Sequence, residues 1–130
     1  MKQFLIAAIA ASSFSAINTH AQTSKLLLDN DKLRITEFIS QPGEDVCGKG
    51  KHTHGDHATV LITDAQVKTV EADGTAVMET YLANKHLFAI IKNGATEKMN
   101  TDGTFWAKGT THSVTNVGSK PIKFYIVETK

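Results

Sequence analysis

The stretch "IKFYIVE", residues 122–128, is the clearest sign of the fold in this chain. Apolar Ile122, Phe124 and Ile126 alternate in it with more polar residues. Successive side chains of a β-strand point to opposite faces, so this alternation predicts a strand with one buried and one more polar face.

Segments of similar length precede this stretch and are rich in Val, Ile, Thr, Phe and Tyr: residues 32–40, 59–63, 66–71, 75–82, 86–91, 104–107 and 113–116. Turn-forming pairs such as Asp73-Gly74 and Asn93-Gly94 separate them. After residue 21 the only helical pattern that we expect is one or two turns near residues 23–28. The chain is therefore predicted to be all-β, with antiparallel strands in a sandwich or barrel.

The first 21 residues have the pattern of a secretory signal peptide. Lys2 precedes an apolar stretch of about 14 residues, which is shorter than the roughly 20 that span a bilayer. We expect cleavage after Ala21, location in the periplasm or outside the cell, and no membrane contact for the mature protein. Residues 22–130 then form a single domain of 109 residues, since 130 − 21 = 109.

Charge and cysteine content narrow the class of protein further. Without Lys2, 13 basic and 13 acidic side chains remain and neither sign forms a long run, so no nucleic-acid partner is expected. Cys47 is the only cysteine, so no disulfide can form within the chain. We expect Cys47 to be an ordinary buried or half-exposed thiol, with a thiolate metal ligand as the alternative.

Three of the six histidines lie in the hexapeptide "HTHGDH" that begins at His52. His52 and His54 are two positions apart, so on a strand they share a face and can bind one metal ion. His57 is out of phase with this pair. It joins them only if the chain turns at Gly55-Asp56, where glycine accepts a positive φ.

A further histidine lies in the segment "GTTHSVTN", from Gly109 to Asn116. A strand that follows a turn at Gly109 places His112, Val114 and Asn116 on one face, so His112 can point inward. Asn116 either orients a ligand or fixes the turn at Gly118.

Together these two histidine segments resemble the two sequence motifs of cupins, a family of small β-barrel proteins. "HTH" at residues 52–54 is similar to the first motif, and "GTTHSVTN" at residues 109–116 is similar to the end of the second. The resemblance covers nearly all of residues 22–130. It implies a double-stranded β-helix, the cupin jelly-roll barrel.

The match departs from the cupin pattern at several positions. Val46 and Asp64 stand where the first motif has glycines, and Thr101 and Ala107 stand where the second has glycine and proline. His57 stands at the position of a glutamate. The first four changes affect the geometry of loops, whereas the last one changes the metal chemistry.

In cupins, three residues of the first motif and the histidine of the second hold a divalent metal at one mouth of the barrel. The resemblance therefore implies His52, His54, His57 and His112 as metal ligands, with Asp56 as the rival third ligand. An imidazole in place of the carboxylate makes a divalent site more positive by one charge. This change disfavours Mg and Mn and favours Fe, Zn, Ni or Cu.

Such a site suits two functions. The first is an enzyme, an oxygenase-type oxidoreductase whose metal polarises a small organic substrate. Glu44 and Asp56 are close enough in sequence to be considered as its base, and neither is assigned. The second is a non-catalytic exported protein that binds a metal or a small ligand, which the short chain favours because it has little room for a lid.

Residues 86–91, "HLFAII", are apolar on both faces, so a strand there has no solvent side. Either the N-terminal segment or a second subunit must cover it. We therefore expect a homodimer.

Overall fold

The structure, a computed structural model, describes residues 22–83, 87–99, 105–109 and 111–130, and the expected signal peptide lies outside them. The described residues form no helix, and hence none long and apolar enough to cross a membrane. Their β-strands are β1 (Thr23–Asp29), β2 (Leu33–Ser40), β3 (His52–Thr53), β4 (His57–Leu61), β5 (Ala65–Glu71), β6 (Ala76–Tyr81), β7 (Leu87–Lys92), β8 (Ala95–Met99), β9 (Phe105–Gly109), β10 (Thr111–Asn116) and β11 (Ile122–Thr129).

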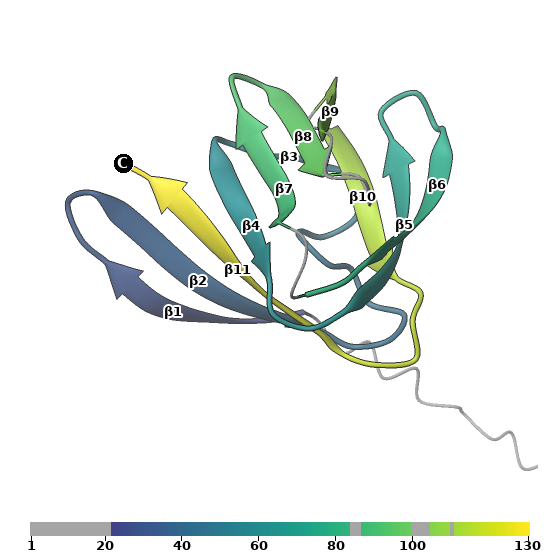
Figure 1. Cartoon of the computed structure of the whole chain (residues 1–130), viewed down its shortest axis with the longest axis horizontal. Coiled ribbons are helices and arrows are strands. Elements are labelled where there is room, and N and C mark those ends of the chain that lie inside the picture. The colour runs from purple at the N-terminus through teal and green to yellow at the C-terminus, as the bar shows by residue number, and fades with distance from the viewer. Residues whose placement is uncertain (1–21, 84–86, 100–104, 110) are drawn as a thin grey trace, which may run out of the picture.

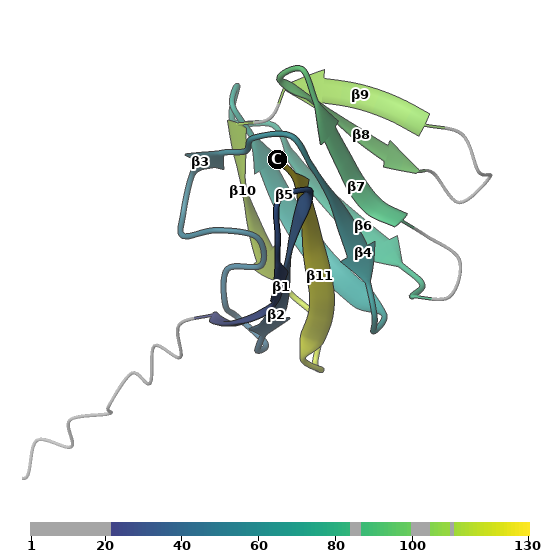
Figure 2. The same ribbon diagram turned by 90° about the vertical axis from the view of Figure 1, so that its left-hand side faces the viewer.

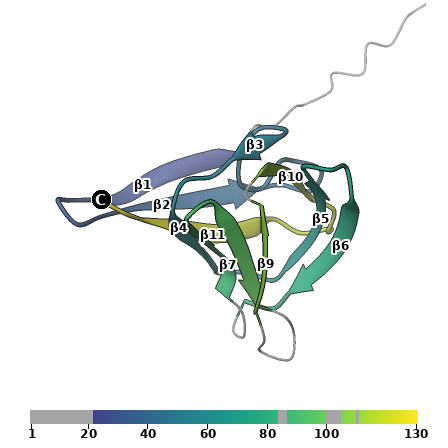
Figure 3. The same ribbon diagram turned by 90° about the horizontal axis from the view of Figure 1, so that it is seen from above.

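The strands form two antiparallel sheets, which confirms the predicted all-β architecture. The larger sheet has the order β1-β2-β11-β4-β7-β8-β9, and the smaller one has the order β3-β10-β5-β6. Seen from above, the smaller sheet curves around the side opposite the larger one (Figure 3). The β1–β2 hairpin extends to one side of this barrel (Figure 1), whereas β8 and β9 form the other edge of the larger sheet (Figure 2).

The core lies between the sheets. Ile122, Phe124 and Ile126 of β11 are all buried, as their alternation predicts. Phe124 stacks on Phe38 of β2 with ring centroids 5.3 Å apart, and Val114 of β10 joins the same core from the smaller sheet. Burying one side chain of this size stabilises a fold by roughly 1.5–3 kcal/mol, so the inner face of β11 is a main link between the sheets.

Each of the eight predicted strands has a counterpart whose described ends differ from the prediction by at most two residues. β1, β3 and β8 are strands that the sequence analysis does not predict. The helical turns expected near residues 23–28 are wrong, because this segment is β1 and pairs with β2 along its length. Its three consecutive leucines lack the alternation of a strand, so pairing with β2 rather than the local pattern decides its conformation.

The side chain of Asn116 joins the end of β10 to the end of β2 and to the turn that precedes β11. Asn116 is fully buried, and its Nδ2 donates hydrogen bonds to the carbonyls of Ser40 (3.1 Å) and Lys120 (3.0 Å). Its Oδ1 accepts a hydrogen bond from the backbone N–H of Gly118 at 3.0 Å. Of its two predicted roles, this geometry supports the one in the turn at Gly118.

The N-terminal strand does not cover β7. β1 is the edge strand of the larger sheet and is separated from β7 by β2, β11 and β4. Its leucines Leu26, Leu27 and Leu28 are 56%, 45% and 40% exposed. The prediction that the N-terminal segment covers residues 86–91 is therefore wrong for Thr23–Asp29. The other predicted cover, a second subunit in a homodimer, stays a prediction.

Candidate metal centre

The loop between β2 and β3 forms one wall of the site. Val46 in this loop is fully buried, and its backbone N–H donates to the carbonyl of Val114 on β10 at 2.9 Å. The carboxylate of Asp45 accepts a hydrogen bond from the backbone N–H of Gly50 at 2.8 Å. Gly50 has a φ of 56°, which glycine adopts without strain. The loop is thus held at both ends, beside β10.

The short strand β3 forms the next wall. It pairs with the beginning of β10 so that His52 lies opposite His112. The neighbouring pair, Thr53 and Thr111, brings two hydroxyl oxygens to 2.8 Å from each other. Neighbouring residues of a strand point to opposite faces, so the threonines link the strands while the histidines point to the other side. His54 follows directly after β3.

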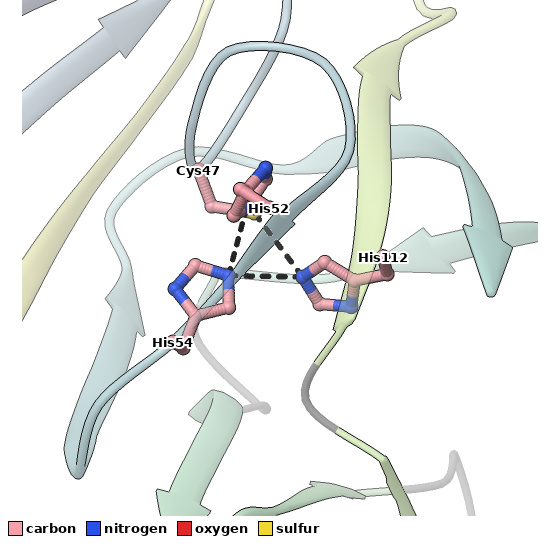
Figure 4. A group of neighbouring side chains, drawn as sticks. All are labelled: Cys47, His52, His54 and His112. Atoms are coloured by element: carbon pink, nitrogen blue, oxygen red, sulfur yellow. Dashed lines mark hydrogen bonds between the residues drawn. The ribbon is translucent and has the colours of Figure 1, made fainter. Parts of the chain in front are cut away.

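Four donor atoms converge at this point (Figure 4). The Nε2 atom of His54 lies 2.9 Å from Nε2 of His52 and 2.9 Å from Nε2 of His112. The Sγ atom of Cys47 lies 3.4 Å from Nε2 of His52 and 3.6 Å from Nε2 of His112. All four atoms lie within 4.8 Å of one another.

The backbone fixes the ring of His52. Its Nδ1 lies 2.8 Å from the carbonyl oxygen of Gly50, and because a carbonyl only accepts hydrogen bonds, Nδ1 carries the proton. Nε2 of His52 therefore presents a lone pair to the other rings. A Cβ atom at Gly48 would lie 2.8 Å from Cδ2 and 2.9 Å from Cγ of this ring, so only glycine leaves it room.

Burial favours the neutral form of two imidazoles at the site, those of His54 and His57. Burial is the main cause that lowers the pKa of His54 to about 3, and repulsion from His52, His57 and His112 lowers it further. Burial also lowers the pKa of His57, against the opposing effect of its hydrogen bond to the Gly55 carbonyl. Neutral imidazole is the form that binds a metal ion.

The donor set fits a divalent transition metal. Nitrogen lone pairs 2.9 Å apart repel each other unless a proton or a cation lies between them. Imidazole and thiol donors suit Zn, Cu, Fe or Ni better than Mg or Ca. The group of one cysteine and three histidines could therefore bind a metal of this class.

Comparison with solved structures identifies the fold. A cupin domain from Bordetella pertussis Tohama I has a TM-score of 0.57 and 19% sequence identity, over 85% of this chain and 94% of that one. The chain has a cupin fold. A double-stranded β-helix protein from Klebsiella pneumoniae has a TM-score of 0.51 and 13% identity, over 84% and 76% of the two chains. No protein-family model and no curated protein match the sequence.

The cupin barrel brings three of the four predicted ligands into one group. His52, His54 and His112 belong to it, whereas His57 is not among the four residues whose donor atoms lie within 4.8 Å. The ring centroid of His57 lies 4.9 Å from that of His54, and its Nδ1 lies 2.7 Å from the carbonyl oxygen of Gly55. The assignment of His57 as a ligand therefore stays a prediction.

The two acidic residues considered from the sequence have partners in loops of the cupin barrel. The carboxylate of Asp56, the rival third ligand, accepts a hydrogen bond from the backbone N–H of Asn93 at 3.0 Å, at the turn between β7 and β8. The carboxylate of Glu44 accepts one from the backbone N–H of Gln41 at 2.7 Å. The chain passes from β3 to β4 at Gly55-Asp56, where the sequence predicts a turn. Gly55 does not have the positive φ expected for this turn, so that part of the prediction is wrong.

From the sequence, Cys47 is only an alternative ligand and Glu71 is not a candidate. The one sequence signal for Cys47 is its position five residues before His52. Glu71 of β5 lies directly opposite His112 on β10, and the two are 7% and 4% exposed. Alternation along β5 places Glu71 on the inner face of the cupin barrel, and this alternation is the signal that could have identified it.

Proposed function

We propose that this protein is an exported, metal-binding cupin whose metal site binds or acts on a small organic molecule. The metal is a divalent transition ion, Fe, Zn, Ni or Cu, held by His52, His54 and His112, with His57 as the predicted further imidazole. The observation that carries the proposal is the 2.9 Å approach between nitrogens of His54 and His112, which are 58 residues apart in sequence.

The residues beside the metal centre favour a polar small molecule. A metal bound there supplies a Lewis acid that polarises a coordinated oxygen atom. Thr69 and Glu71 are buried on the inner face of β5, on the same side of the sheet as His112. The Thr69 hydroxyl donates a hydrogen bond to Glu79 of β6 at 2.7 Å. Polar groups, among them the Glu71 carboxylate, thus lie on the inner side of the barrel beside the proposed metal.

Two versions of this function differ in whether the site turns its ligand over. An oxygenase-type oxidoreductase needs open coordination positions for substrate and dioxygen. A non-catalytic metal- or ligand-binding protein does not. The sulfur of Cys47, 3.4 Å from a nitrogen of His52, favours the second version, because a fourth donor fills the shell of a tetrahedral ion.

Metal analysis of protein purified without a histidine tag tests the proposal. We expect a transition metal to copurify or to bind after reconstitution with Zn, Fe, Cu or Ni. The His112→Ala variant should lose this metal, whereas Lys68→Ala, on the outer face of β5, should keep it. Failure of the wild-type protein to bind any of the four metals would reject the proposal.

Oxygen uptake by the iron-loaded protein separates the two versions. A panel of thiols, diketones and hydroxy acids serves as substrate, with His112→Ala as the control. Uptake that depends on His112 supports the enzyme. A ligand that binds in calorimetry without any turnover supports the non-catalytic protein.

Export is tested by the mass of the protein recovered from the periplasm or the medium of an expressing bacterial host. The mature chain should begin at Gln22, directly after the expected cleavage site. An intact chain that stays in the cytoplasm would reject this part of the proposal.

A further inference from the structure

We infer that the thiolate of Cys47 is a fourth metal donor, so that the centre consists of one sulfur and three imidazole nitrogens. This inference rests on the proposed metal-binding function. It adds a ligand that lies outside both histidine segments, and it predicts which of the candidate metals the site prefers.

Four of the six donor–donor distances within the group are close to those around a tetrahedral ion with one sulfur ligand. Zinc binds cysteine sulfur at about 2.3 Å and histidine nitrogen at about 2.0–2.1 Å, which places sulfur and nitrogen roughly 3.5 Å apart at a tetrahedral angle. Sγ of Cys47 lies 3.4 Å and 3.6 Å from the two nearest histidine nitrogens. The same geometry separates two nitrogens by roughly 3.3 Å. The observed 2.9 Å pairs therefore need to open by a few tenths of an ångström.

The backbone holds Cys47 in this place without a metal. Its neighbour Val46 is fully buried in the core and is bonded through its backbone N–H to Val114, two residues after His112. On the other side of the loop, the Asp45 carboxylate accepts the backbone N–H of Gly50. A donor that the fold already positions loses little conformational freedom when it binds a metal.

The charge and softness of a thiolate narrow the choice of metal. Three neutral imidazoles leave the full charge of a divalent ion in a partly buried site, whereas a thiolate offsets one unit of it. Thiolate ligands favour zinc and copper, whereas an all-imidazole set also suits iron and nickel. We therefore expect the site to select zinc or copper over nickel and iron.

Cobalt-loaded protein gives a direct readout of the sulfur ligand. A thiolate bound to Co(II) produces sulfur-to-cobalt charge-transfer absorption in the near ultraviolet. Cys47 is the only cysteine, so this band can come from no other thiol of the chain. We expect the band in wild-type protein and in Lys68→Ala, which removes a side chain on the outer face of β5 but no sulfur, and we expect it to be absent from Cys47→Ser.

Affinity and reactivity give two further readouts on the same proteins. Substitution of a residue that hydrogen-bonds to a metal ligand lowers metal affinity about 10–100-fold. Loss of the sulfur ligand itself should therefore weaken zinc binding by at least roughly that factor. The preference for zinc over nickel should shrink in Cys47→Ser. In wild-type protein, bound zinc should protect Cys47 from alkylation by iodoacetamide.

The outcomes separate this inference from the proposed function. Wild-type protein that binds metal without the charge-transfer band, and whose cysteine is alkylated at the metal-free rate, overturns the inference and leaves the proposed function standing. Wild-type protein that binds no metal rejects both. If Cys47→Ser does not fold, zinc-edge X-ray absorption of the wild-type protein decides, by the presence or absence of a sulfur ligand.

Discussion

At the scale of single residues, the absence of a side chain at Gly48 controls the position of a metal ligand. A Cβ atom there would lie 2.8–2.9 Å from three atoms of the His52 ring, a contact that forces the ring to move. We predict that Gly48→Ala lowers zinc affinity roughly 10–100-fold although residue 48 does not touch the metal. Calorimetric titration of the metal-free protein with zinc measures this change.

Gly55→Ala is the matched control for Gly48→Ala. A Cβ atom at Gly55 meets nothing within 4 Å, and its backbone is not in the left-handed region, so alanine fits there. This variant makes the same chemical change next to His54 without crowding a ring. If both alanine variants bind zinc as the wild type does, the steric argument for Gly48 is wrong.

The pKa of His54 predicts acid lability of the metal-free protein. This pKa is lowered to about 3 in the fold, mainly by burial, whereas an unfolded histidine titrates near 6.5. Between these values the unfolded chain binds a proton that the folded chain rejects. The free energy of unfolding therefore decreases as the pH falls from about 6.5 toward 3.

Urea unfolding of chelator-treated protein at several pH values in this window measures the effect. The His54→Gln variant lacks the titrating group, so its stability should depend less steeply on pH than that of the wild type. Equal slopes for the two proteins would contradict the assignment of the acid lability to His54.

The sequence predicts three members of the group of four donors and gives the fourth, Cys47, only as an alternative ligand, for a physical reason. His52 and His54 share a strand face, and His112 begins a strand in the second motif, so local spacing indicates all three. The position of Cys47 depends instead on the loop of residues 45–51, which folds back because Val46 enters the core and bonds to β10. Spacing along one segment carries no information about such a contact.

At the scale of secondary-structure elements, the Asn116 side chain links the C-terminal end of β10 to Ser40 at the end of β2 and to the turn of residues 118–120. It is fully buried and makes three hydrogen bonds to backbone groups, two of them to the carbonyls of Ser40 and Lys120. We predict that Asn116→Ala lowers the free energy of unfolding by about 2–4 kcal/mol, since buried carbonyls lose their donor. Denaturant unfolding monitored by circular dichroism measures this loss.

The adjacent Val117→Ala variant serves as its control. Val117 is 41% exposed, so removal of its methyl groups should change the stability by less than about 1 kcal/mol. Equal destabilisation by the two alanine variants would mean that the hydrogen bonds of Asn116 are not the cause.

The leucines of β1 offer a second surface on which a homodimer could form, besides residues 86–91, from which the homodimer is predicted. Leu26, Leu27 and Leu28 are at least 40% exposed on an edge strand. If two copies of β1 pair antiparallel about Leu27, Lys25 of one copy faces Asp29 of the other. We predict that Leu26→Lys shifts the protein from dimer to monomer in light-scattering measurements, because it buries a charge in the interface.

Thr80→Lys, which also adds a lysine to an exposed strand position, is the control for Leu26→Lys and should stay dimeric. A monomeric wild-type protein at high concentration would reject the dimer. A dimer that Leu26→Lys leaves intact would place the interface elsewhere, for example at β7.

The strands differ in how well local sequence predicts them. β11 has a clean alternation, and it is one of the eight strands whose positions are correctly predicted. β1 has three leucines in a row and is a strand because β2 pairs with it, and β3 has only two residues that β10 holds in place. Where a partner rather than the pattern decides the conformation, the sequence alone gives no clear signal.

At the scale of the whole molecule, the candidate metal centre joins segments that are far apart in the chain. Cys47 and His52 come from the loop and strand that follow β2, and His112 is the second residue of β10 in the smaller sheet. A long-range contact of this kind forms only in the folded state. The family resemblance anticipates that the two histidine segments meet, whereas composition and periodicity alone reach only an all-β fold.

A metal bound across these segments should therefore stabilise the entire domain. An ion that binds only the folded state stabilises it by about 4 kcal/mol at a free concentration 1,000 times its dissociation constant. For a domain of roughly 100 residues this corresponds to a rise in Tm of the order of 15 °C. We predict such a rise when zinc is added to metal-free protein, measured by scanning calorimetry, and its reversal by a chelator.

The His112→Ala variant determines whether this stabilisation arises at the proposed centre. His112 supplies a nitrogen that lies within 4.8 Å of the three other donors, so zinc should no longer raise the Tm of the variant. Lys68→Ala removes a side chain from the outer face of β5, away from this group, and we expect zinc still to raise its Tm. A rise of similar size in His112→Ala and wild type would mean that zinc binds elsewhere on the protein, and the centre at the mouth of the barrel would have to be rejected.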